Sequence, residues 1–165
     1  MPAIHSVLRP RRHLHWALLA LLLPLAACQS AGRGPGASAG VSGSASGAMA
    51  AVRSGNGLES MSPDSRLEQA ALQQAIYMAS RGRMTHTTGW GRDFATRVGG
   101  NGIDGAAAEN IAMGRMGIDR LFAMWMASPP HRRNMLDPRF RHYGLAYAEA
   151  ANGSSERYWA LVLGR

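Results

Sequence analysis

The pattern of hydrophobic and polar positions divides the chain into three regions. An apolar run over residues 16–27 holds six leucines. Residues 29–47 are mostly Gly, Ala and Ser. They have too few large apolar side chains to repay the entropy of ordering, so a flexible tether is expected there. Residues 48–165 carry helical and strand-like periods, and this length fits one compact domain.

Three segments of the domain have the period of a helix. A short helix is expected over residues 48–53. The longest is expected to start with Ser62 as N-cap and Pro63 at the first helical position, and to end before Gly82. Its face has apolar residues three or four apart, interrupted by one glutamine: Leu67, Ala70, Ala71, Gln74, Ala75, Met78 and Ala79. The third helix covers residues 118–126 and is broken by a Ser-Pro-Pro sequence.

Strand-like segments dominate the second half of the domain. Residues 83–105 hold many glycines and are expected to be mostly loop, with a short helix over residues 92–98. A short strand is expected over residues 106–112. Two more are expected over 143–148 and 158–163, separated by a turn-prone Asn-Gly-Ser-Ser sequence. Helices first and an antiparallel pair last predict an α+β fold.

The N-terminal region has the layout of an export signal. Three arginines precede the apolar run, which is shorter than the ~20 residues that a helix needs to cross a bilayer. Residues 1–27 are therefore expected to be a cleaved signal peptide. The run ends in Leu-Ala-Ala-Cys, which resembles the lipobox of bacterial lipoproteins, where the cysteine is acylated. We expect residues 28–47 to be a lipidated Cys28 and its linker, with the membrane as a partner.

Cys28 is the only cysteine, so no intramolecular disulfide can form and packing must stabilise the fold. The alternative interpretation is an unmodified thiol beside an ordinary cleavage site. Gln29 follows the cysteine, whereas lipoproteins held at the inner membrane typically have Asp there. A cell-envelope location is expected, at the outer membrane if the bacterium has one.

The charge of the chain excludes one class of partner. All 18 basic residues are arginines, and 14 of them lie in the domain beside ten acidic residues. This small excess lacks the clustered basic stripe of nucleic-acid-binding proteins, so a nucleic-acid partner is not expected.

Three polar residues lie where their side chains can face a cleft. His86 follows the long helix in Met-Thr-His-Thr, and Glu109 lies within Ala-Glu-Asn-Ile-Ala. His131 lies in Trp-Met-Ala-Ser-Pro-Pro-His-Arg-Arg-Asn, and a Tyr-Gly-Leu-Ala sequence comes later. These pieces in this order resemble a bacterial CAP domain. That superfamily includes cysteine-rich secretory proteins, antigen-5 allergens and plant pathogenesis-related proteins, and the resemblance spans residues 48–164.

The resemblance implies a three-layer α-β-α sandwich with a central antiparallel sheet. It also implies a cleft lined by histidine and acidic residues, in which some relatives bind a divalent metal. By position, His86 matches the first cleft histidine and Glu109 the acid of the Glu-Asn motif. Asn110 is expected beside them, and His131, from the bacterial variant of the motif, is expected to fill part of the same cleft.

Two positions depart from the animal and plant pattern. Ser128 stands where those relatives have an acid, and Arg157 or Tyr158 stands where they have a second histidine. The remaining ligand set for zinc is His86, Glu109 and His131. These three would be a minimal open set in which water completes the tetrahedron. Two arginines that follow His131 would repel a cation unless they point to solvent.

Each candidate residue also has a purely structural interpretation. His86 can interact with the carbonyl end of the long helix, and Glu109 can accept backbone N–H groups. Asn110 can shape the loop by hydrogen bonding. Ser128 is interpreted as the N-cap of a following turn, and the alternative is a nucleophile with His131 as its base.

Three functions remain open at this stage. The first is a binding module of the envelope that takes a small ligand, such as a lipid or a cell-wall fragment, in the cleft or an adjacent apolar groove. The second is a hydrolase that uses His86, Glu109 and His131, with or without metal-activated water. The third is an interaction protein whose surface matters and whose cleft is vestigial. The sequence does not decide whether the protein is an enzyme.

Overall fold

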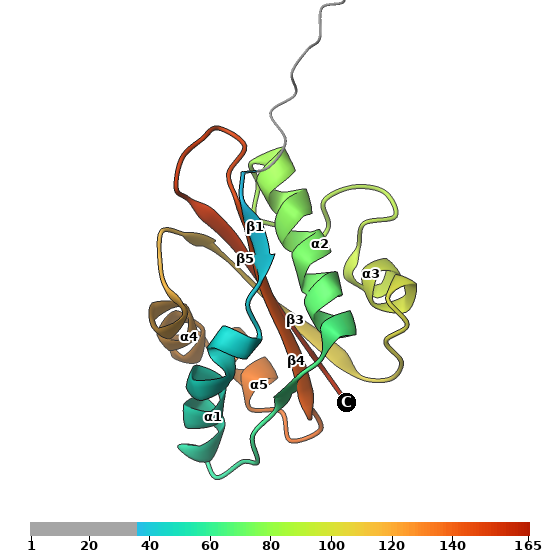
Figure 1. Ribbon diagram of the computed structural model, residues 1–165. Coiled ribbons are helices and arrows are strands. Elements are labelled where there is room, and N and C mark those ends of the chain that lie inside the picture. Colours follow the sequence, from blue (N-terminus) through green and yellow to red (C-terminus); the bar gives the residue numbers. More distant parts are fainter. Residues whose placement is uncertain (1–35) are drawn as a thin grey trace, which may run out of the picture. The chain divides into compact units, whose positions relative to one another are not determined.

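A five-stranded sheet forms the middle layer of the domain. The computed structural model describes residues 36–165 (Figure 1), so the predicted signal peptide and Cys28 lie outside the described residues. Strands β1, β4, β5 and β3 lie in this order and pair antiparallel. Their bounds are Ser38–Gly40 for β1, His142–Glu149 for β4, Arg157–Gly164 for β5 and Ala107–Gly114 for β3. A two-residue strand, β2 (Ser62–Pro63), pairs parallel with β4.

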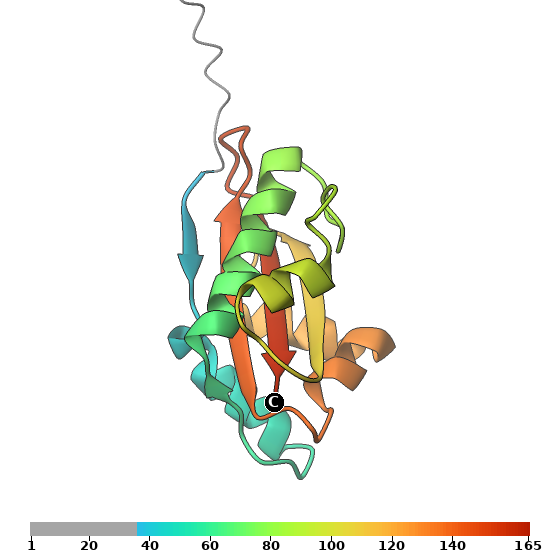
Figure 2. The ribbon, with the colours of Figure 1, turned by 90° about the vertical axis from the view of Figure 1, so that its right-hand side faces the viewer.

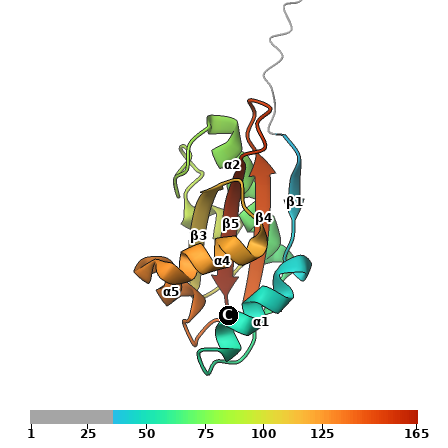
Figure 3. The ribbon, with the colours of Figure 1, turned by 90° about the vertical axis from the view of Figure 1, so that its left-hand side faces the viewer.

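Helices cover both faces of this sheet, which confirms the predicted three-layer α+β fold. One face carries α2 (Ser65–Arg81) and α3 (Phe94–Gly100), which lie in front of the strands in Figure 2. The other carries α1 (Ser46–Ser54), α4 (Ile118–Ala127) and α5 (Pro129–Met135), which lie in front in Figure 3. Within the described residues, no helix is both long and apolar enough to cross a membrane.

The alternation of side chains along the central strands explains the layers. In β5, Trp159, Leu161 and Leu163 belong to the hydrophobic cluster under α1, α4 and α5. Their neighbours on the strand, Tyr158, Ala160 and Val162, belong to the cluster under α2. Successive side chains of a strand point to opposite faces, so a strand covered on both sides is apolar throughout. This pattern is the reason that β5 reads as a continuous hydrophobic run.

The long helix approaches the sheet most closely at Gly144 of β4. A Cβ atom on Gly144 would overlap the backbone nitrogen of Glu68, so only glycine lets the first turn of α2 rest on the strand. The helix starts slightly later than predicted. Asp64, not Ser62, is the N-cap, and its carboxylate accepts hydrogen bonds from the backbone N–H groups of Arg66 and Leu67. The predicted helix end is confirmed, with Gly82 in the left-handed conformation.

The ordered domain begins earlier than the composition predicts. Residues 38–47 were expected to belong to a flexible tether, and this is wrong because they contain β1, a 3₁₀ turn (Gly43–Ala45) and the start of α1. Ala45 is fully buried, and the hydroxyl of Ser42 accepts a hydrogen bond of 2.8 Å from the backbone N–H of Leu145. This segment covers the free edge of β4 and is part of the fold.

Candidate functional site

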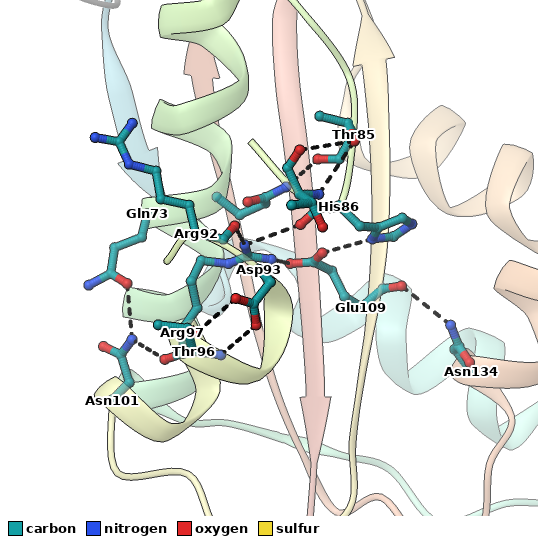
Figure 4. Close-up of polar contacts among 12 residues, drawn as sticks. Gln73, Thr85, His86, Arg92, Asp93, Thr96, Arg97, Asn101, Glu109 and Asn134 are labelled. Carbon is teal, nitrogen blue, oxygen red and sulfur yellow. Dashed lines mark hydrogen bonds and ion pairs between the residues drawn. The ribbon is translucent and has the colours of Figure 1, made fainter. Parts of the chain in front are cut away.

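Glu109 lies on the edge strand β3 and is held by two side chains from the α2–α3 side of the sheet (Figure 4). Its side chain is only 2% exposed. Arg97 of α3, equally buried, donates a charge-assisted hydrogen bond to Oε2. The ring Nδ1 of His86 lies 2.8 Å from Oε1. Each carboxylate oxygen therefore has its own partner, which is what a buried carboxylate requires.

Arg97 also fixes the loop that carries His86. Its guanidinium donates to the carbonyl oxygens of Arg92 at 2.7 Å and His86 at 3.3 Å. Asp93 caps α3 by accepting from the backbone N–H of Thr96 at 2.9 Å, which sets the position of the helix. The His86 side chain remains 55% exposed. His86 is thus an accessible imidazole that a buried carboxylate orients.

Asn110, the next residue of β3, serves the opposite face of the sheet. Its side-chain amide donates to the backbone carbonyl of His131 at 3.1 Å, and its amide oxygen accepts from Asn134 at 2.8 Å. Asn134 also donates to the backbone carbonyl of Glu109 at 3.4 Å. These bonds tie α5 to the edge strand. Asn110 was interpreted as a hydrogen bonder that shapes a loop; it does form these hydrogen bonds, but it lies in strand β3 and joins that strand to α5.

His131 lies on α5 beside the same edge strand, where its backbone carbonyl accepts the hydrogen bond from Asn110. Its ring packs against Trp125, with ring centroids 6.5 Å apart. Burial, and secondarily the positive charge that His86 can carry, hold the pKa of His131 below its ordinary value. The structure thus brings together His86, Glu109, Asn110 and His131 around β3, but it commits the Glu109 carboxylate to internal partners.

This arrangement does not fit the predicted metal site. Among the described residues, no group of three or more His, Cys, Asp and Glu side chains is placed to hold a metal ion. Both oxygens of Glu109 are taken, and Arg97 already supplies the positive charge that a cation would bring. The expected zinc set of His86, Glu109 and His131 is therefore not assembled.

The two positions that depart from the animal and plant pattern stand apart from this cluster. Ser128 is the N-cap residue of α5 with Pro129 in the first turn, as expected, although its side chain accepts no capping hydrogen bond from the described helix. Arg157 begins β5, where it pairs with Glu149 at 3.5 Å and stacks over the ring of Tyr147. The partners of Glu109 and His86 thus come from other parts of the chain.

A groove of about 850 Å³ runs along α4 and α5. Its lining combines apolar side chains with three exposed arginines and one acid: Met126, Ala127, Pro129, Leu136, Pro138, Arg132, Arg133, Arg139 and Asp137. Nothing in the sequence places this groove, because helical periodicity marks the buried face of a helix but not a hollow between two helices. The role of Arg97 is likewise not visible in the sequence, since nothing there distinguishes a buried arginine from an exposed one.

Comparison with known proteins agrees with this fold. The family described as "CAP: Cysteine-rich secretory protein family" matches residues 47–163. The protein YkwD of Bacillus subtilis (strain 168) is 29% identical over 103 residues, which are 62% of this chain and 40% of YkwD. The chain thus spans less than half of the length of that relative.

Solved structures show the same architecture. An outer surface protein from Borrelia burgdorferi superposes with a TM-score of 0.66 at 19% identity, covering 79% of this chain and 98% of the other. An extracellular protein containing a SCP domain from Bacillus anthracis gives a TM-score of 0.58 at 20% identity, covering 71% and 37%. The family match extends over most of the chain and agrees with the observed fold, and this chain therefore belongs to the cysteine-rich secretory protein (CAP) family.

Proposed function

We propose that this protein is a binding module of the cell envelope that holds an amphipathic, anionic small molecule, such as a lipid, in the groove along α4 and α5. The composition of that groove carries the proposal. A ligand pocket is expected to be mostly apolar, with a few polar groups that fix orientation. Half-buried Met126 and Leu136 offer the apolar contact, and exposed Arg132 and Arg133 stand beside them.

The charges of the groove favour an anion. Arg139 is neutralised in part by Asp137, at 2.6 Å between Nη2 and Oδ2. Arg132 donates to the side chain of Asn56 at 3.2 Å, and Arg133 has no ion pair with any described residue. A guanidinium binds carboxylate and phosphate groups through paired hydrogen bonds. Arg133 is therefore the residue that we expect to meet the charged end of the ligand.

The hydrogen bonds between β3 and α5 hold one wall of the groove in place. Asn110 and Asn134 join α5 to the edge strand, so the cluster fixes the helix that forms one wall of the groove. Binding sites are more specific when their walls are held rigidly. In this proposal Glu109, Arg97 and Asn110 position the groove, and they need not contact the ligand.

The envelope location is proposed from two observations. The N-terminal region has the layout of a signal peptide with a lipobox at Cys28. The two structural neighbours are named as an outer surface protein and an extracellular protein. Radioactive palmitate fed to the producing cells should label the protein, and Cys28→Ser should abolish the label. Label that persists in Cys28→Ser would refute the anchor.

A photoreactive diazirine analogue of palmitate tests the groove itself. After irradiation of the protein in phosphatidylcholine nanodiscs, peptide mass spectrometry should find the adducts within α4 and α5. Met126→Asp should remove them, and Met113→Asp, a change of another half-exposed methionine on β3, should not. Adducts that are spread over the surface, or that survive Met126→Asp, would contradict ligand binding in the groove. This result would leave the proposed lipid anchor at Cys28 untouched.

A second function, hydrolysis, is favoured by one observation. His86 is exposed and oriented through Nδ1 by a buried carboxylate, which is the arrangement of a general base with its orienting acid. Activity profiling against esters and peptides, with His86→Gln as the matched variant, tests this function. Turnover present in the parent and lost in His86→Gln would favour the hydrolase, whereas equal background in both would exclude it.

A further inference from the structure

A second, smaller pocket lies at the end of α2, on the segment that leads into His86. Its volume is about 250 Å³, and its lining consists of two arginines and three threonines: Arg81, Arg83, Thr85, Thr87 and Thr88. Gly82 turns the chain between the arginines in the left-handed conformation, with φ at 60°. Among the described residues, no acidic side chain lines this pocket. Its size is below that of pockets for drug-sized ligands, which begin near ~300 Å³.

Thr88 carries the first observation that points to a ligand. Thr88 is one of the residues that line the pocket and is 8% exposed, and its buried hydroxyl has no hydrogen-bond partner in the described part of the chain. An unpaired buried polar group costs about 1–3 kcal/mol. A buried hydroxyl without a partner beside a pocket is explained if a bound group supplies the partner.

The arginines carry the second observation. Arg81 and Arg83 are both exposed, and neither forms an ion pair with a described residue. Their positive charge is thus uncompensated at the mouth of a pocket whose other polar groups are hydroxyls. The two arginines and the hydroxyls of Thr87 and Thr88 offer hydrogen-bond donors to an oxyanion, whereas the hydroxyl of Thr85 already donates to the backbone carbonyl of Thr87 at 3.3 Å.

The loop that carries the threonines is fixed on both sides. The side-chain amide of Gln74, which is itself buried in α2, donates to the backbone carbonyl of Thr85 at 2.5 Å. One residue later, Arg97 donates to the carbonyl of His86. The backbone N–H of Thr87 in turn donates to the hydroxyl of Thr85 at 3.4 Å. A pre-organised loop lowers the entropic cost of binding.

We propose that Arg81, Arg83, Thr85, Thr87 and Thr88 form a binding site for a compact oxyanion, a phosphate group. This site is separate from the α4–α5 groove, and its existence does not depend on the function proposed for that groove. It lies next to His86 along the chain, but the His86 side chain binds Glu109, whose carboxylate does not line the pocket. The anion belongs to a soluble phosphate compound or to a phospholipid headgroup.

The threonines provide a direct experiment. The whole chain has four threonines, three in this pocket and Thr96 in α3, where Thr96 hydrogen-bonds to Asp93. The full chain, labelled with ¹⁵N-threonine and kept in zwitterionic detergent micelles, should show four amide signals. Inorganic phosphate should shift the signals of Thr85, Thr87 and Thr88 and leave Thr96 in place. If all four shift together, or none shifts, the site does not exist.

Variants separate the site from a general effect of charge. Arg81→Gln and Arg83→Gln should each weaken phosphate binding roughly tenfold, because each removes a charge-assisted hydrogen bond. Arg120→Gln, which changes an exposed arginine of α4, should leave the affinity unchanged. Equal loss in all three variants would overturn the proposal.

Thr88→Val replaces the hydroxyl by a methyl group of the same shape. If the hydroxyl binds the anion, this variant should lose phosphate affinity several-fold while its thermal stability is kept or increased, since an unpaired buried group is removed. Unchanged phosphate affinity in a folded Thr88→Val variant would show that the hydroxyl takes no part, and would overturn the assignment.

Two ligands that both carry a phosphate group distinguish a soluble phosphate compound from a phospholipid headgroup. Glycerol 3-phosphate stays in solution, whereas phosphatidic acid is presented in phosphatidylcholine vesicles. Trp90, two residues after Thr88, is fully exposed, and the other two tryptophans of the described chain are buried. Binding at a lipid headgroup should move the fluorescence emission to shorter wavelengths as Trp90 enters the interface. Binding of the soluble compound alone identifies the other source, and binding of neither overturns the proposal.

Discussion

Arg97 and Glu109 form an ion pair in which both side chains are only 2% exposed. The pair joins α3 to the edge strand β3, and it satisfies one of the two oxygens of a carboxylate that would otherwise be buried without a counter-charge. A buried ion pair adds little stability compared with an apolar pair, but removing one partner leaves the other charge uncompensated. The cluster is therefore sensitive to the loss of either residue.

Arg97→Met should destabilise the protein by about 3–5 kcal/mol, because Glu109 keeps only His86 as a partner. The midpoint of urea unfolding measures this loss. The double variant Arg97→Met/Glu109→Leu should be more stable than Arg97→Met, since no charge is then left unpaired. As a control, Arg66→Met breaks an exposed pair with Asp64 and should cost no more than about 1 kcal/mol. Similar losses in Arg97→Met and Arg66→Met would contradict the role assigned to the buried pair.

The helices and central strands were predictable because their hydrophobic patterns are regular and extend over many residues. In α2, residues three and four apart are buried from Leu67 to Ala79, and in β4 and β5 the apolar runs match the observed strands closely. A resemblance carried by several ordered motifs then added the three-layer arrangement. These features depend on many residues at once, so a single misread position does not change them.

Features that depend on one contact were not predictable. The tether was expected to reach Gly47 because Gly, Ala and Ser bury little apolar surface, but the free edge of β4 pairs with Ser38–Gly40 through the backbone. Ser62 and Asp64 are both good N-caps, and only the pairing of Ser62–Pro63 with β4 decides for Asp64. The ion pair of Glu109 was not predictable for a related reason, since the sequence does not show that Arg97 reaches Glu109.

The contact between α2 and β4 predicts a severe effect at Gly144. A methyl group there would overlap the backbone of Leu67 and Glu68, so Gly144→Ala must push the helix off the sheet. Overpacking of this kind costs about 3 kcal/mol or more when backbone cannot give way. Thermal unfolding followed by circular dichroism measures the loss. Gly43→Ala, whose added Cβ would have no described atom within 4 Å, should change stability by no more than about 0.5 kcal/mol. A stable Gly144→Ala variant would contradict the close approach.

The position of His131 predicts a pH dependence of stability. Its pKa is lowered from 6.5, first by burial and second by the charge of His86. Below about pH 6.5 the unfolded chain therefore binds more protons at His131 than the folded chain does. The free energy of unfolding should fall as the pH is lowered through this range, and His131 should not change it at higher pH. In His86→Gln one of the two causes is gone, and the pKa of His131 should rise towards 6.5 without reaching it. Titration of the ring proton signal by NMR measures this, and an unchanged pKa would show that the two rings do not interact.

Arg53 of α1 should be as important to the groove as any residue that lines it. Its fully buried guanidinium donates to four backbone carbonyls, those of Glu59, Met135, Asp137 and Phe140. Met135 ends α5 and Asp137 lines the groove, so Arg53 fixes the segment that follows α5 and forms part of the groove. Arg53→Met leaves these carbonyls without their charged donor and should cost at least about 3 kcal/mol in urea unfolding. Arg53→Lys keeps the charge but not the planar fork of donors, so it should restore only part of the stability. Full restoration by lysine would mean that charge alone, without the geometry of the guanidinium, holds α1 to the segment after α5.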